Sequence, residues 1–350
     1  MLSALASVPR YPCAQLPTPV QRLAELGRAL GIPELWIKRD DLSGTLYGGN
    51  KIRKLSFLLG QALEEKRHRI VTAGAIGSHH SLATTLYGRR AGLEVEAALF
   101  PQPPTDHVKA NLAANLGAGA HPIPLRSPIE VPFVLALRSR RSGAMLIPGG
   151  GSSPRGAIGY VEAALELAEQ VRTGELPEPD LAIVPLGTGG TAAGLELGLR
   201  LAGLRTRLLA VRVIDRIIGN ATTVVRLAHR IQKEMHRFDP ALPWVRVGRC
   251  DVEHRQFGGR YGEATPAAID AAHQARALEG IELETTYTAK ALAAIVCRAR
   301  EGSLPNGPIL FWNTFSSVRP PGYDPTGAAI RHLLPPQWKH IFDDENMWDD

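Results

Sequence analysis

The chain has 350 residues, of which 44% are hydrophobic and 21% charged, a globular composition long enough for two compact units or one large α/β body. No apolar run reaches the roughly twenty residues of a membrane-spanning helix, and residues 1–15 lack the apolar core of a signal peptide, so we expect a soluble protein. The net charge of +6 comes from scattered arginines without interleaved aromatic residues, which argues against a nucleic-acid partner and leaves an anionic small molecule or a generally basic surface.

Short β-rich runs alternate with amphipathic helical runs between residues 36 and 213, the pattern of a parallel sheet covered by helices. The pattern predicts strands at residues 35–38, 69–73, 95–100, 145–147, 181–185, 207–213 and 309–312. It also predicts five helices. One begins at residue 51, one ends at residue 90, two span residues 108–116 and 157–171, and one follows residue 191. Between residues 213 and 309 the signal is weak, and the acidic, aromatic tail from residue 335 has no assigned role.

A glycine-rich loop lies between a predicted buried strand and a helix, with the sequence Gly187-Thr188-Gly189-Gly190-Thr191. Glycines allow several backbone N–H groups to approach a phosphate, and the helix N-terminus adds partial positive charge. The loop lacks the Lys-Ser/Thr pair of a Walker A motif and the GxGxxG spacing of a dinucleotide site. It therefore predicts a binding loop for an isolated phosphate monoester, with a plain tight turn as the alternative.

A second loop, Gly48-Gly49-Asn50-Lys51, heads a helix. The helix dipole disfavours a positive charge there and lowers the pKa of an amine, as a nucleophilic lysine requires. A solvated surface lysine is the alternative, and the neighbouring Arg53 and Lys54 suit that interpretation equally well.

The turn Gly77-Ser78-His79-His80 also joins a strand to a helix. Ser78 suits a helix N-cap or a contact with a substrate carboxylate. A metal site is not expected, because adjacent histidines on a helix point in different directions. The cysteines Cys13, Cys250 and Cys297 lie far apart, which argues against a disulfide framework or a zinc site and favours a reducing cytoplasm.

These loops all follow strands, where open α/β sheets place their ligands. A phosphate-binding loop, an amine and a carboxylate-binding turn are together the groups that would bind an amino acid condensed with pyridoxal phosphate.

Several segments resemble the 1-aminocyclopropane-1-carboxylate deaminase / D-cysteine desulfhydrase family, in order from about residue 10 to 320. They are residues 16–20, 36–42, 48–55, 74–76, 148–152, 156–160, 187–191, 261–262, 265–266 and 287–292. The GGNKxRKL pattern at residues 48–55 is specific to this family, and the chain is identified as a member of it.

The resemblance implies fold type II of the pyridoxal-phosphate enzymes, with two open twisted α/β domains and pyridoxal 5'-phosphate between them. Residues 1–53 and 157–350 would form the large cofactor-binding domain, and residues 54–156 a smaller α/β domain inserted in it. Members are usually homodimers, so a cytoplasmic homodimer is expected.

The resemblance also implies roles for single residues. Lys51 would carry the cofactor as a Schiff base, Ser78 would lie beside the substrate, and Tyr287 would stack near the reacting carbon. Thr314 would meet the pyridine nitrogen. The expected cofactor-binding residues are Lys51, Asn50, His79, Gly187, Thr188, Gly189, Gly190, Thr191 and Thr314, and no metal is expected.

The chain departs from the family pattern around this pocket. The family usually reads Gln-Ser-Asn-His or Gln-Ser-Asn-Gln at positions 77–80, and its Asn hydrogen-bonds the phenolic oxygen of the cofactor. His79 could do so with a larger, titratable ring. Ala289 replaces a glycine, residues 315–317 (Phe-Ser-Ser) replace a glycine-rich turn, and Arg260 stands where glycine is usual. These changes suggest a different substrate or a modified reaction.

The favoured function is a lyase that acts on a small amino acid by D-cysteine desulfhydrase-like β-elimination and releases a 2-oxo acid and ammonia. Deaminase members have Glu after the motif tyrosine, where this chain has Thr288. The neutral pair Thr288 and Thr314 would weaken the electron sink and favour a good leaving group over ring opening. The alternatives are deaminase-type ring opening or β-replacement in a specialised pathway, and a binding protein without turnover.

Overall fold

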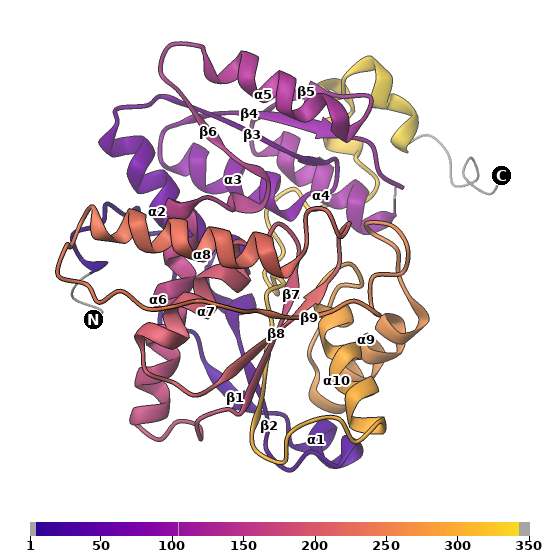
Figure 1. The fold of residues 1–350 in the computed structure, drawn as a ribbon. Coiled ribbons are helices and arrows are strands. Elements are labelled where there is room, and N and C mark those ends of the chain that lie inside the picture. The colour runs from indigo at the N-terminus through magenta and orange to yellow at the C-terminus, as the bar shows by residue number, and fades with distance from the viewer. Residues whose placement is uncertain (1–4, 104, 343–350) are drawn as a thin grey trace. The chain divides into compact units, whose positions relative to one another are not determined.

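The computed structural model describes residues 5–103 and 105–342 and divides into two compact units (Figure 1). The first contains the chain up to Val8, Ala14–Lys54 and Ser152–Val318. The second contains Pro9–Cys13, Leu55–Gly151 and the described part of the chain after Val318. Residues 319–342, expected in the large domain, thus cluster with the second unit. The acidic end of the tail, residues 343–350, lies outside the described residues.

The first unit is built on a six-stranded sheet of order β1-β2-β10-β7-β8-β9, in which β1 is antiparallel and the other pairs are parallel (Figure 1). Its strands are β1 (Val20–Arg22), β2 (Leu35–Lys38), β7 (Leu181–Leu186), β8 (Arg207–Arg212), β9 (Asp251–Glu253) and β10 (Ile309–Trp312). All residues of β7 and β10 are buried. Uninterrupted apolar strands of this kind are typical of a parallel sheet covered on both faces.

Helices surround this sheet. They are α1 (Ala24–Leu30), α6 (Pro154–Arg172), α7 (Gly190–Leu201), α8 (Ala221–His236), α9 (Pro266–Glu279), α10 (Thr288–Arg300) and the first turn of α2 (Asn50–Glu64). Helix α6 begins earlier than predicted, because Ser153 caps the backbone N–H of Gly156 at 3.1 Å and a proline occupies the first turn. No helix among the described residues is long and apolar enough to cross a lipid bilayer.

The second unit has a four-stranded parallel sheet of order β5-β4-β3-β6. Its elements are β3 (Arg69–Ala75), α3 (His79–Arg90), β4 (Glu94–Phe100), α4 (Asp106–Gly117), β5 (Ala120–Pro124), α5 (Val131–Ser139) and β6 (Ala144–Ile147), together with the rest of α2. The predicted strands at 69–73, 95–100 and 145–147 are confirmed. The 3-10 helices η5 (Ala328–Leu333) and η6 (Pro336–Phe342) bury Ile330 and Trp338 in one apolar cluster with α4, which explains why this segment belongs to the second unit.

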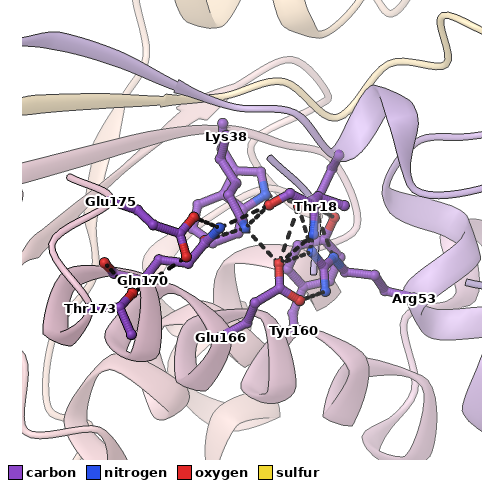
Figure 2. A network of polar contacts seen from close by, with 10 residues as sticks. Thr18, Lys38, Arg53, Tyr160, Glu166, Gln170, Thr173 and Glu175 are labelled. Carbon is purple, nitrogen blue, oxygen red and sulfur yellow. Dashed lines mark hydrogen bonds and ion pairs between the residues drawn. The ribbon is translucent and has the colours of Figure 1, made fainter. Parts of the chain in front are cut away.

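A buried polar network holds the first turn of α2 within the first unit (Figure 2). The guanidinium of Arg53 lies 2.8 Å from the Asp40 carboxylate and 2.9 Å from Glu166 on α6. Lys38, at the end of β2, donates to Glu166 at 2.5 Å and to the backbone oxygen of Thr18 at 2.6 Å. Arg53 is fully buried, so its interpretation as a solvated surface residue is wrong.

The network pairs two cations with two carboxylates. Burial by itself would raise the pKa of the Asp40 carboxyl, but the charge of Arg53 outweighs burial and lowers this pKa below its ordinary value. The hydroxyl of Tyr160 and the indole N–H of Trp312 also donate to Asp40, at 2.7 and 2.8 Å. Balanced charge and satisfied hydrogen bonds allow such ions in the interior. Because Arg53 lies two residues after Lys51, the network fixes the helix turn that carries this lysine.

Candidate cofactor and active site

Lys51 is the second residue of α2, and its amine donates a hydrogen bond to the side-chain oxygen of Asn50 at 2.7 Å. The amine also lies 5.8 Å from the centre of the Tyr287 ring. Burial lowers the pKa of Lys51 to about 8, while the negative charge of Glu284 acts in the opposite direction. At pH 7 the neutral, nucleophilic fraction is then about 300 times that of an ordinary lysine. Lys51 is partly buried, and its lowered pKa argues against a fully solvated surface lysine, with burial as the main cause of the shift.

Asn50 connects Lys51 to the other predicted residues of the first unit. Its side-chain nitrogen donates to the Thr191 hydroxyl at 3.2 Å, and its backbone N–H donates to the Thr314 carbonyl at 3.1 Å. Gly49 has a φ of +87°, and a Cβ there would lie 2.5 Å from the backbone oxygen of Phe315. Only glycine fits this position, so the Gly-Gly pair brings Lys51 close to the strand end at Thr314.

The predicted phosphate loop joins β7 to the N-terminus of α7. Gly189 caps this helix in the left-handed conformation, with a φ of +89°. The hydroxyl of Ser152 lies 2.7 Å from the Thr188 hydroxyl and accepts from the backbone N–H of Gly190 at 3.2 Å. A Cβ on Gly190 would lie 2.6 Å from the Ser152 oxygen. The loop therefore gathers hydroxyls and N–H groups at a helix N-terminus, a donor set that suits a phosphate monoester.

Tyr287 immediately precedes α10, and its hydroxyl lies 2.7 Å from that of Tyr261. The Tyr287 ring borders the phosphate loop, since a Cβ on Gly187 would lie 3.3 Å from its edge. Burial raises the pKa of Tyr287 well above its usual value. The two tyrosines therefore form a neutral, hydrogen-bonded pair at neutral pH. Sequence reasoning gave Tyr261 no role, although the segment at residues 261–262 was part of the resemblance.

Glu284 is an acidic residue of this site that sequence reasoning missed. Its carboxylate accepts hydrogen bonds from the backbone N–H groups of Thr286 at 2.8 Å and Thr288 at 2.7 Å, and from the Thr288 hydroxyl at 3.0 Å. Burial raises its pKa to about 7. Thr288 is thus hydrogen-bonded to this carboxyl group, and the neutral pair of Thr288 and Thr314 at the pyridine nitrogen stays a prediction. An acidic residue just before a helix was the available signal.

Ser78 and His79 belong to the second unit. Ser78 is the N-cap of α3, and its hydroxyl accepts from the Ser81 N–H at 3.3 Å, which confirms the capping interpretation. His79 is the first residue of that helix, and its Nε2 lies 2.8 Å from Nε2 of His107. His80 instead bonds the Thr72 hydroxyl at 2.9 Å. In the described part of the chain, no group of three or more His, Cys, Asp or Glu side chains is placed to hold a metal ion.

The residues of the first unit fit pyridoxal phosphate. A partly neutral amine suits its aldehyde, and the loop of N–H groups and hydroxyls suits its phosphate. Two positions of these loops have no room for a side chain. A Cβ on Gly190 would lie 2.6 Å from the Ser152 oxygen, and a Cβ on Gly49 would lie 2.5 Å from the backbone oxygen of Phe315.

These features define an enzyme that uses pyridoxal phosphate, and the chain belongs to this class: residues 14–314 match the family of pyridoxal-phosphate dependent enzymes. Among its relatives is a D-cysteine desulfhydrase of Serratia proteamaculans, 32% identical over 89% of this chain and 94% of the relative. A presumed 1-aminocyclopropane-1-carboxylate deaminase of Pyrococcus horikoshii is 30% identical over 90% of this chain and 94% of the relative.

A solved structure of an ACC deaminase homologue is similar to this chain, with a TM-score of 0.78 and 30% identity over 95% of this chain and 98% of the other. The predicted α/β architecture of fold type II and the predicted family are thereby confirmed.

Proposed function

We propose that the protein is a lyase of the D-cysteine desulfhydrase type, which removes a β-leaving group from a small amino acid and releases a 2-oxo acid and ammonia. The observation that carries the proposal is the Lys51 amine, with its pKa of about 8, beside Tyr287 and the phosphate loop. A desulfhydrase relative that aligns along 94% of its length supports this reaction class. We also propose that the first unit is the cofactor-binding domain, because all these residues belong to it.

We assign the cofactor's anchor to Lys51 and its phosphate to Gly187, Thr188, Gly189, Gly190 and Thr191, assisted by Ser152. Asn50, His79 and Thr314 complete the proposed binding set. When bound, pyridoxal phosphate withdraws electrons from Cα of the amino acid, which makes the Cα proton removable.

The protein's own residues then have to move protons. Lys51 would hold the cofactor, and its amine, with a pKa of about 8, is neutral often enough to accept the Cα proton at Nζ. The Tyr287–Tyr261 pair keeps its hydroxyl protons at neutral pH and can donate a hydrogen bond to the departing sulfur. Ser78, whose hydroxyl lies at the N-terminus of α3, is the proposed contact for the substrate carboxylate.

Ring opening of 1-aminocyclopropane-1-carboxylate is a second candidate. Glu284 favours it, because this carboxyl group is bonded to Thr288, the position at which deaminase members are expected to have Glu. A group with a pKa of about 7 can both accept and donate a proton near neutral pH.

Incubation with D-cysteine, L-cysteine, β-chloroalanine and 1-aminocyclopropane-1-carboxylate tests these proposals. We expect 2-oxo acid from D-cysteine and β-chloroalanine, with loss of activity in Lys51→Ala and retained activity in Lys233→Ala, an exposed control lysine. Product from the cyclopropane substrate alone would favour ring opening. No 2-oxo acid from any of the four would contradict the lyase proposal.

We further propose that the protein is a cytoplasmic homodimer. Support for a partner surface comes from Ile129, Phe133 and Leu137, which are 76%, 75% and 66% exposed and recur every fourth residue along α5 and the turn before it. Sedimentation of the wild type at increasing concentration measures the oligomeric state, and a monomer throughout would contradict the proposal.

A further inference from the structure

Helix α10 binds the segment from Glu253 to Tyr261, which starts at the last residue of β9 and is called the β9 segment below. At one end of the segment, the Glu253 carboxylate accepts a hydrogen bond from the side chain of Arg298 at 3.0 Å. At the other end, the Tyr261 hydroxyl lies 2.7 Å from that of Tyr287, the residue just before α10. The helix therefore holds both ends of the segment, and one of these ends belongs to the candidate active site.

Two further contacts hold the middle of the β9 segment. The Lys290 amine donates to the backbone carbonyl of Phe257 at 2.7 Å, and the side-chain nitrogen of Gln256 donates to Sγ of Cys297 at 3.5 Å. Relative to Lys290, the other residues that α10 contributes lie three positions before and seven and eight positions after it. This spacing places them on one face of the helix. The β9 segment is therefore bound along its length by a single face of α10.

Lys290 is the member of this set that is most costly to bury. Its side chain is fully buried, although a methionine of similar length would fill the same space without a charge. Burial lowers the pKa of its amine, while the negative charges of Glu284 and Glu263 act in the opposite direction. No carboxylate of the described residues forms an ion pair with this amine, which is directed at a backbone carbonyl instead. What Lys290 adds over an apolar side chain is therefore the hydrogen bond to Phe257.

The Phe257 carbonyl lies directly before a turn made of two glycines. Gly258 and Gly259 have φ values of +82° and +99°, in the region that favours glycine. Glycine restricts the backbone less than any other residue, so this turn does not by itself fix the direction of the chain that follows. The Lys290 bond fixes the backbone at the point where the turn begins, four residues before Tyr261.

We propose that Lys290 is a positioning residue for the Tyr261–Tyr287 pair. Its hydrogen bond to the Phe257 carbonyl holds the start of the glycine turn, so that the Tyr261 hydroxyl stays within hydrogen-bond distance of Tyr287. The inference rests on the proposed function, in which this pair donates a hydrogen bond to the departing sulfur. Lys290 acts through Tyr261 and is therefore not itself a catalytic residue.

Hydrogen exchange of the purified protein, followed by mass spectrometry over residues 257–262, tests the positioning directly. Lys290→Met removes the donor and keeps the length of the side chain. We expect amide exchange in this segment to become roughly 2- to 10-fold faster, the equivalent of one hydrogen bond. Lys290→Leu, a second variant without the donor, should give the same result. Lys233→Met changes an exposed lysine on α8 and is the control that should leave the exchange unchanged.

A double-mutant cycle with Tyr261→Phe tests whether Lys290 acts through the Tyr261 hydroxyl. In the wild type, Lys290→Met should lower kcat for β-elimination by roughly 10-fold with little change in KM, because small displacements of a group near the reacting atoms have effects of this size. In Tyr261→Phe, which lacks the hydroxyl, the same substitution should lower kcat by less than about 2-fold, since the two residues are coupled. A residue that only stabilised the fold would give the same loss in both backgrounds.

Equal exchange over residues 257–262 in the wild type and Lys290→Met would overturn the proposal. Equal fold changes of kcat in the wild-type and Tyr261→Phe backgrounds would overturn it as well. Exchange is measured without turnover. The absence of 2-oxo acid from the wild type, which would contradict the proposed function, is therefore distinguishable from a failure of the positioning role of Lys290.

Discussion

Replacement of Glu284 by Gln should change stability with opposite sign at low and high pH. Burial raises the Glu284 pKa from 4.5 to about 7, so the folded carboxyl keeps its proton to about pH 7 while the unfolded one loses it near pH 4.5. The stability that this raised pKa contributes is fully present below pH 4.5 and is lost as pH rises to about 7. A difference of about 2.5 pH units corresponds to at most about 3 kcal/mol.

The amide introduced by Glu284→Gln cannot ionise, so the variant escapes this loss. It also gives up one acceptor oxygen, which costs about 1–2 kcal/mol at every pH, because a backbone N–H such as that of Thr286 loses its partner. The wild type has already lost about 1 kcal/mol of this contribution at pH 5 and about 3 kcal/mol at pH 8, so we expect Glu284→Gln to be less stable than wild type by up to about 1 kcal/mol at pH 5 and more stable by about 1–2 kcal/mol at pH 8.

Urea unfolding of both proteins at pH 5 and pH 8 measures these differences. Glu282→Gln is the matched control, since the Glu282 side chain is 59% exposed, and the difference between the two variants at each pH isolates the effect of burying the carboxyl group. A Glu284→Gln effect that is equal at the two pH values would refute the reasoning.

Other predictions follow from the buried network, the tyrosine pair and the exposed surface of α5. Arg53→Met leaves Asp40 and Glu166 short of a cation, and urea unfolding should show a loss of about 3–5 kcal/mol, whereas a loss below about 1 kcal/mol would contradict the network's role. Tyr287→Phe should slow β-elimination more than tenfold in a 2-oxo acid assay yet keep the absorption band of bound cofactor, and unchanged turnover would exclude its proposed role. Phe133→Glu should shift a dimer to monomer by sedimentation at equal concentration, and an unaffected dimer would place the interface elsewhere.

Local sequence patterns predicted the elements whose residues are uniformly apolar. Strands β7 and β10 have only buried residues, and their predicted starts coincide with the structure. Helices α9 and α10 were not predicted, because their buried faces consist largely of alanines such as Ala268, Ala271 and Ala291, which give weak hydrophobic contrast. Strand β5 was missed because it contains two prolines in five residues.

The candidate site was predictable only where chemistry and backbone geometry are local. Glycines and threonines at residues 187–191 indicate an anion loop by their types alone. The partners of Arg53 are not local, since Glu166 lies 113 positions away, so a buried arginine looked like a surface one. The pKa of Lys51 depends on burial in the folded protein, which the dipole argument from sequence could not supply.

The visible absorption spectrum of the purified protein tests the central claim most directly. If Lys51 anchors pyridoxal phosphate, the wild type shows the band of lysine-bound cofactor and Lys51→Ala loses it. Lys54→Gln, which alters a buried lysine one turn away, retains the band. A band that persists in Lys51→Ala and disappears in Lys54→Gln would contradict the assignment of Lys51.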